Sequence, residues 1–217
     1  LGGMMGTGVA PVITADLMRL GGENVALVLG IGVLICIIFG MMGMLIAAYL
    51  MLALPLAPAL DQIAGLNTLA IHLFIAYYAM LAAITPPIAL AAFIASRISD
   101  SDPMRTSWHA ARLGIVLYFI PFFFLFEPAL IFQGALIDTV TWFSFNIIAV
   151  TIIAGASEGR LLGFGLLRGW VRVVLFAAAL LIGFPEWQTT LAGGLIVGAI
   201  IALRGYTRLP GQVHTNA

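Results

Sequence analysis

Thr85, Pro86 and Pro87 are the residues whose types and spacing point most directly to chemistry, because they interrupt a long apolar segment. That segment runs from Leu66 to Ile98, whereas a helix needs only about 20 residues to cross a bilayer. Proline lacks a backbone N–H and clashes with the carbonyl group four residues back, so the pair should open the helix near mid-membrane. Secondary transporters hold ions and substrates at such breaks, where the irregular backbone is buried in protein or lines a wet cavity. The break therefore indicates a binding site of a membrane carrier.

Composition places the chain among integral membrane proteins. Of its 217 residues, 63% are hydrophobic and 8% are charged, whereas a soluble domain has about 25% charged residues. The net charge is zero, so we expect no nucleic-acid partner. The chain begins Leu1-Gly2-Gly3 with neither an initiator Met nor a basic leader, which is not typical of a signal peptide. We expect it to begin inside a longer protein.

The sequence contains none of the residue patterns that are typical of enzymes. It has no His-Glu metal spacing, no nucleophile elbow and no phosphate-binding loop. Met41, Met42 and Met44 are soft potential metal ligands, but no Cys or His lies beside them, so we expect them to fill gaps in packing. We expect no enzymatic activity, no organic cofactor and no resident metal.

Two apolar arms precede the broken helix. Val25 to Gly40 spans about 24 Å as a helix, which is less than the ~30 Å hydrocarbon core. Leu45 to Leu60 is the second arm, and a Gly-rich tip joins the two. This pattern indicates a re-entrant helical hairpin over residues 25–60, while two ordinary spans with a Gly-rich bend are the alternative.

The rest of the chain is predicted to be helical as well. The broken helix covers residues 66–98, and Asp102-Pro103 is a favourable start for a short interfacial helix that ends at Arg112. A span follows over residues 113–131. Residues 133–217 form a C-terminal membrane extension of about three helices, which are predicted at Ile137–Ala154, Val173–Phe184 and Leu191–Leu203.

The arginines, which are the only basic residues apart from His, alternate along the chain. They fall in groups separated by two predicted spans: Arg97, Arg105 and Arg112; Arg160, Arg168 and Arg172; Arg204 and Arg208. The turns around Gln133 and Glu186 carry none. The positive-inside rule then places the C-terminus in the cytoplasm and Asp61 outside, with Arg19 as a single exception.

Several short segments, taken in order, resemble the large membrane subunit of TRAP (tripartite ATP-independent periplasmic) transporters. They are Met41-Met42-Gly43, Ala47-Ala48-Tyr49, Ala57-Pro58-Ala59-Leu60, His72-Leu73-Phe74, Tyr77-Tyr78-Ala79, Thr85 to Phe93, Asp102 to Thr106 and Pro128-Ala129-Leu130. The nearest likeness is to the C-terminal half of the fused permease of the TAXI branch. It covers residues 5–132, so residues 1–132 are expected to form one domain.

The resemblance implies an all-α inverted-repeat transporter of the bacterial inner membrane, of which this chain is the second half. Such permeases import small organic acids by an elevator-like movement with sodium as the coupling ion. The implied partners are a periplasmic substrate-binding protein and the N-terminal half of the permease. Carried onto this chain, the sodium-binding positions are Gly40, Met41, Met42, Gly43, Ile84, Thr85, Pro86 and Pro87. The positions expected to line the substrate are Met44, Ala47, Ala48, Tyr77 and Tyr78.

One departure from the family pattern affects the hairpin tip. Family members usually have Pro and one or two Thr where this chain has Met44, Leu45 and Ile46. Hydroxyl ligands are therefore missing there, although backbone carbonyl groups remain. A non-transporting membrane scaffold, derived from a truncated permease half, is the alternative function, and a passive channel is a weaker one.

Individual polar residues also have alternative explanations. Thr85 is either a sodium ligand or a cap of the kinked helix, and Tyr77 and Tyr78 either face the substrate or pack in the core. His72 is expected to be a buried, hydrogen-bonded structural residue rather than a proton relay. Glu127 is expected to extend towards water from the end of its span.

Overall fold

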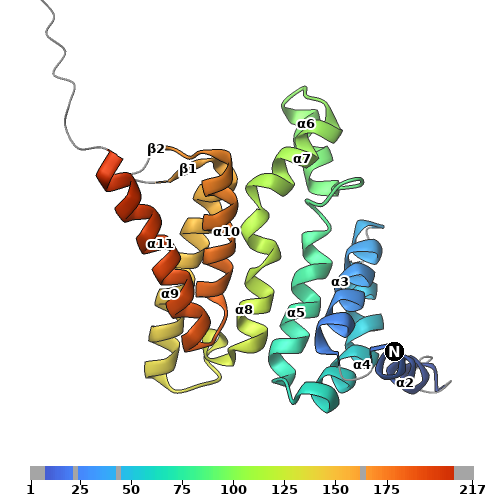
Figure 1. Ribbon diagram of the computed structural model, residues 1–217. Helices are drawn as coiled ribbons and strands as arrows, with labels where there is room; N and C mark the ends of the chain where they lie inside the picture. Colours follow the sequence, from blue (N-terminus) through green and yellow to red (C-terminus); the bar gives the residue numbers. More distant parts are fainter. Residues whose placement is uncertain (1–7, 22–23, 43–44, 162–164, 208–217) are drawn as a thin grey trace, which may run out of the picture. The chain divides into compact units, whose positions relative to one another are not determined.

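The computed structural model describes residues 8–21, 24–42, 45–161 and 165–207, and these form an all-α protein of the membrane type (Figure 1). Two described helices are long and apolar enough to cross a membrane, at Ile46–Ala64 and Leu136–Glu158. A bent pair, Pro103–Leu113 with Ile115–Phe126, is a third candidate. Four shorter apolar helical stretches contain between 10 and 17 residues, which is fewer than the roughly 20 of a full span: Val25–Met41, Thr68–Leu81, Gly169–Gly183 and Trp187–Ala202.

Chain contacts divide the protein into two compact units, Leu1–Thr139 and Val140–Ala217. The sequence-based boundary lies between residues 132 and 133, seven residues earlier. That assignment of domains stays a prediction.

The helical hairpin of the first unit consists of α3 (Val25–Met41) and α4 (Leu45–Ala64), which pack together. Asn24 caps α3 by accepting a hydrogen bond from the Leu27 N–H at 3.1 Å. The prediction that the second arm ends at Leu60 was wrong, because α4 continues through Pro55 and Pro58 to Ala64. The helix persists despite two missing N–H groups because its apolar face, including Leu56, is buried against its neighbours.

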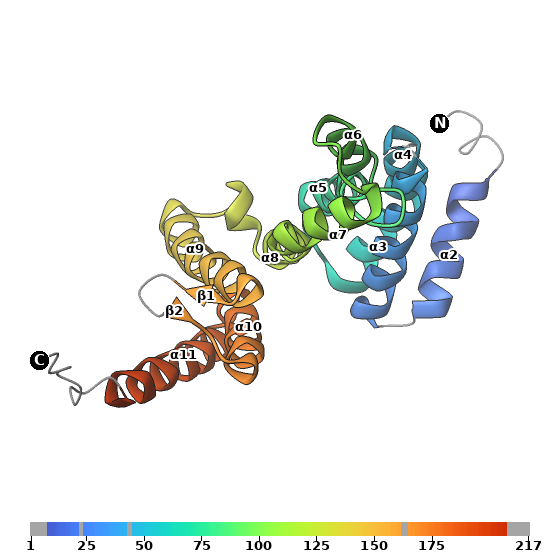
Figure 2. The ribbon, with the colours of Figure 1, turned by 90° about the horizontal axis from the view of Figure 1, so that it is seen from above.

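The broken helix packs through its first part beside both arms of the hairpin, as both views show (Figures 1 and 2). Its first part is α5 (Thr68–Leu81), which Asn67 caps by accepting from the Ala70 N–H at 3.1 Å. Its second part is the short helix α6 (Leu90–Ile98). The break is therefore confirmed, and it is wider than the sequence indicated.

Two further helices complete the neighbourhood of the break and of the hairpin. The helix α7 (Pro103–Leu113) packs on α6, and Asp102 caps it as predicted by accepting from the Arg105 N–H at 2.7 Å. The helix α2 (Val9–Gly21) packs on α4.

The predicted continuous span over residues 113–131 was wrong. This segment consists of a 3₁₀ turn η1 (Ile115–Tyr118), the helix α8 (Ile120–Phe126) and a second 3₁₀ turn η2 (Pro128–Ile131). It is bent by 66° from α7. Pro121 and Pro128 each lie at the start of an element, where their missing N–H groups interrupt the helical hydrogen bonds.

The core of the first unit lies between α3, α4, α5 and α8. Its fully buried side chains include Leu29, Leu56, Phe74 and Leu125, one from each of these helices. The aromatic rings of Phe74 and Phe122 meet edge to face with their centroids 5.3 Å apart. This packing fixes α5, and therefore the start of the break, relative to the hairpin.

The second unit contains most of α9 (Leu136–Glu158), with α10 (Gly169–Gly183) and α11 (Trp187–Thr207). A two-stranded ribbon of β1 (Arg160–Leu161) and β2 (Gly165–Leu166) lies between α9 and α10 in the sequence. Helices α10 and α11 pack closely, because Gly193 faces the Ala178 carbonyl group where a Cβ would come within 2.5 Å of that oxygen.

Candidate functional site

The backbone between α5 and α6 is irregular over residues 82–89, where the predicted Thr-Pro-Pro motif lies. The Ala91 N–H donates back to the Ala83 carbonyl oxygen at 3.0 Å, and this bond closes residues 83–91 into a loop. Ala89 has φ of +38°, the left-handed region that residues with a Cβ rarely adopt. Such backbone survives only where its surroundings hold it in place, and this is typical of functional sites.

The Thr85 hydroxyl group is at the centre of a small polar network. It donates to the Leu81 carbonyl oxygen at 2.8 Å, and its oxygen lies 2.6 Å from the Tyr118 hydroxyl group. The Tyr78 hydroxyl group donates to the Tyr118 backbone carbonyl oxygen. Because the Thr85 proton is engaged with Leu81, we assign Tyr118 as the donor in the second bond. Thr85 thus caps α5 as one sequence alternative expected, and one lone pair of its oxygen remains for a ligand.

Backbone carbonyl oxygens at the break are further groups that could coordinate a ligand. Among the described residues, the carbonyl oxygens of Ile84, Pro86 and Pro87 accept no hydrogen bond. Proline explains part of this lack of hydrogen bonds, because Pro86 and Pro87 have no N–H group that could donate to a nearby carbonyl oxygen. Neutral oxygens without hydrogen bonds are the groups with which unwound helices of transporters coordinate sodium.

The end of the hairpin's first arm lies directly against the last turn of α5. Gly40 is buried, and a Cβ built on it would lie 2.6 Å from the Ala79 carbonyl oxygen and 2.6 Å from the Ala82 Cβ. This approach requires a residue without a side chain. It brings Gly40, one of the tip positions to which the resemblance assigns sodium binding, to the helix end from which the break starts.

A small cavity of about 290 Å³ lies beside the break within the first unit. Its walls are Tyr77, Met80, Leu81, Ile84 and Leu117. Three of these residues belong to α5 and one to the break, so the cavity runs along the end of the helix. Of the predicted substrate-lining residues, Tyr77 is the one that lines this cavity.

The structure locates the other predicted residues as follows. Met42 is exposed at the end of α3, Ala47 is half-buried, and Ala48 and Tyr78 are buried. Gly43 and Met44 lie outside the described residues. Their roles in ion and substrate binding stay predictions.

Two further polar residues have local partners. The Nδ1 atom of His72 lies 3.1 Å from the Tyr49 hydroxyl group, which links the broken helix to α4. Glu127 accepts a hydrogen bond from the Ala129 N–H at 3.1 Å and so caps η2. A hydrogen-bonded structural role was predicted for His72. The capping role of Glu127 was not predicted, although Glu127 directly precedes Pro128 as a capping residue does.

Tyr118 is the residue of the site that sequence reasoning missed. It lies 33 residues after Thr85, in a segment that was predicted to be one regular span. Gly114 brings that segment close, because a Cβ on it would lie 2.8 Å from the Ile84 Cδ1 atom. The sequence signal that could have found this contact is the combination of Gly114 with Pro121, which predicts a bend.

Comparison with known proteins assigns the family. No curated protein and no solved structure matches the chain. The family model described as "Tripartite ATP-independent periplasmic transporter, DctM component" matches residues 1–139, which is more than half of the chain and includes the hairpin, the break and Tyr118. Transporters of this family work with a periplasmic binding protein and a small membrane subunit. The chain therefore belongs to the DctM family, the large membrane permease component of TRAP transporters.

Proposed function

We propose that this chain is a permease component that imports small organic acids together with sodium. In this proposal a periplasmic binding protein delivers the substrate, and the N-terminal half of the permease completes the transport unit. The chain then represents the C-terminal half of a TAXI-type permease. It lies in the bacterial inner membrane with its C-terminus in the cytoplasm, as the alternation of arginines favours.

The observation that carries the proposal is the set of oxygen atoms at the break. The Thr85 hydroxyl oxygen and the carbonyl oxygens of Ile84, Pro86 and Pro87 have lone pairs without hydrogen bonds among the described residues. Sodium is a hard cation for which neutral oxygens are suitable ligands. We assign the ion to these residues, with the hairpin end at Gly40 as the neighbouring wall.

The preference for a carboxylate substrate is supported by the direction of α6. This helix begins at the break, and no side chain caps its first turn. The N-terminus of a helix carries a partial positive charge that favours an anion. A substrate carboxylate at the start of α6 would therefore meet a favourable potential. In this proposal the cavity beside the break, with the apolar side chains of Met80 and Leu117, accommodates the carbon skeleton.

Uptake in proteoliposomes tests the proposal. The chain is reconstituted with the other permease segments and the binding protein, and entry of labelled organic acids is measured with and without an inward sodium gradient. We expect uptake that requires both sodium and the binding protein. Uptake that is independent of sodium would contradict ion coupling and would favour a passive channel.

The scaffold alternative is favoured by the absence of hydroxyl groups at Met44, Leu45 and Ile46. It predicts a folded protein that neither binds sodium nor transports. Sodium binding can be measured separately from transport as a rise in melting temperature, because a ligand that binds only the folded state stabilises it. A well-folded protein that shows neither such a rise nor any uptake would favour the scaffold alternative.

A further inference from the structure

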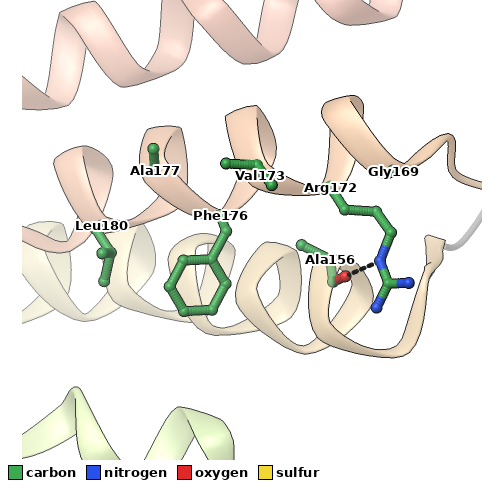
Figure 3. Close-up of a pocket in the computed structure, with 7 residues that line it drawn as sticks. All are labelled: Ala156, Gly169, Arg172, Val173, Phe176, Ala177 and Leu180. Atoms are coloured by element: carbon green, nitrogen blue, oxygen red, sulfur yellow. Dashed lines mark hydrogen bonds between the residues drawn. The ribbon is translucent and has the colours of Figure 1, made fainter.

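A second cavity lies in the C-terminal unit, far along the sequence from the break. It has a volume of about 460 Å³ and is lined by Ala156 of α9 and by one side of α10: Gly169, Arg172, Val173, Phe176, Ala177 and Leu180 (Figure 3). This volume is typical of sites for small molecules, which range over roughly 300–1,000 Å³. Neither the transport reaction nor the family match, which ends at residue 139, accounts for it.

The cavity is long, and apart from one charged side chain it is apolar. Its residues on α10 recur at helical spacing from Gly169 to Leu180, which corresponds to a length of about 16 Å at 1.5 Å per residue. Val173 is 70% exposed, so the cavity opens sideways rather than being sealed in the core. A small hydrophilic anion would gain nothing from such a wall, whereas an acyl chain would.

Arg172 is the charged group of this cavity, and its position is fixed. Its Nε atom donates to the Ala156 carbonyl oxygen at 2.8 Å (Figure 3). Its Nη2 atom donates to the Ser157 carbonyl oxygen. Gly159, with φ of +76°, allows this arrangement, since a Cβ there would lie 3.2 Å from the guanidinium carbon. A guanidinium group has five N–H donors, and Arg172 uses two of them in these bonds. Among the described residues, its Nη1 atom has no acceptor.

The surroundings of Arg172 match the boundary between lipid tails and headgroups. Arg160 and Arg168 lie in the connection between α9 and α10, which contains no carboxylate; Glu158 is the last residue of α9. Trp170 is 61% exposed at the start of α10, where tryptophan is typical of the membrane interface. Basic pockets between transmembrane helices are suited to anionic lipid headgroups.

We propose that this cavity binds one anionic phospholipid. The headgroup phosphate accepts hydrogen bonds from the free donors of Arg172, and an acyl chain lies along Val173, Phe176 and Leu180. The lipid would thereby join the ends of α9 and α10, which Arg172 already links.

Native mass spectrometry of the full chain tests this proposal with two defined lipids. Detergent-purified protein is mixed with dioleoyl phosphatidylglycerol, which is anionic, or with dioleoyl phosphatidylcholine, which has no net charge. We expect one phosphatidylglycerol molecule to be retained with about tenfold preference over phosphatidylcholine. The phosphate of either lipid can accept from Arg172, but the choline cation beside the phosphate is repelled by the guanidinium group, whereas the neutral glycerol is not. Arg172→Ala should abolish the preference. Arg168→Ala, which removes an exposed charge outside the cavity, should retain it.

A second pair of variants keeps the test valid if Arg172→Ala disturbs the end of α9. Ala177→Phe fills the apolar part of the cavity and leaves the guanidinium group in place, so it should also abolish retention. Ala192→Phe adds the same bulk at an exposed position of α11 outside the cavity and should have no effect. Equal retention in the Ala177→Phe variant and the original protein would overturn the proposal. An equal loss in Arg168→Ala and Arg172→Ala would also overturn it, because binding would then follow the total charge of the connection.

Discussion

Replacement of Gly40 by Ala tests whether the hairpin and the broken helix meet as tightly as the structure shows. The added Cβ would lie 2.6 Å from both the Ala79 carbonyl oxygen and the Ala82 Cβ. Neither atom is the end of a flexible side chain, so relief requires a shift of a helix backbone. Carbon atoms pack best at about 3.5–4.0 Å, so the two helices must separate by roughly 1 Å.

The expected cost follows from the known effects of overpacking. Extra methyl groups in a well-packed interior destabilise proteins by about 1–3 kcal/mol. Against this, replacing Gly by Ala in a helix favours folding by about 0.5–1 kcal/mol. Gly30 provides the matched control, because it lies in the same helix and a Cβ on it would meet nothing within 4 Å. The Gly40→Ala variant should therefore be less stable than the Gly30→Ala variant by about 1–3 kcal/mol.

The assay is equilibrium unfolding of the detergent-solubilised protein, followed by circular dichroism during titration with a denaturing detergent. The same variants are then melted with and without sodium. Gly40→Ala should also reduce the sodium-dependent stabilisation, since the shift occurs beside the proposed ion ligands, whereas Gly30→Ala should retain it. Equal unfolding free energies for the two variants would refute the close approach of the hairpin to α5.

Three further predictions concern hydrogen bonds and helix packing. Thr85→Ala should abolish both the sodium-dependent rise in melting temperature and sodium-driven uptake, while expression is retained. Thr85→Ser keeps the hydroxyl group and should preserve both. A Thr85→Ala variant with unchanged sodium dependence would contradict the assigned role. Tyr118→Phe removes one hydrogen bond to Thr85 and should lower the unfolding free energy by about 1 kcal/mol. In a double-mutant cycle its effect should disappear when Thr85 is already Ala, and full additivity would argue against a direct contact. Gly193→Ala should destabilise the C-terminal unit because its Cβ would come within 2.5 Å of the Ala178 carbonyl oxygen. Gly194→Ala, with nothing within 4 Å of its Cβ, should melt at or slightly above the temperature of the original protein, because Ala favours the helix over Gly.

The broken helix is an element whose position, although not its exact ends, was predictable from the sequence. Pro86 and Pro87 located the break, because proline removes an N–H wherever it occurs. The exact ends of the flanking helices were less predictable, since the Thr85 hydroxyl bond to Leu81 and the Ala91 bond to Ala83 close the loop from both sides. Such bonds depend on the final path of the chain and not on local preference.

The segment after α7 shows where the reasoning failed. Its apolar character predicted one span over residues 113–131, but Pro121 and Pro128 divide it into short elements. Hydropathy measures whether a segment belongs in the membrane and carries no information on whether its backbone is continuous. The segment was predicted to be one span because of its apolar content, although it contains two prolines. The contact of Tyr118 with Thr85 was missed as a consequence.

The sequence by itself determined that this is an all-α membrane protein with a helical hairpin, a proline-broken helix and the features of a TRAP permease, because composition and proline act locally. Only the tertiary structure decided that Gly40 meets α5, that Tyr118 donates to Thr85, and that Arg172 joins two helices beside an apolar cavity. These contacts join residues that are between 16 and 42 positions apart along the chain. They depend on how close two backbones come in space, which the order of residues along a single helix does not specify.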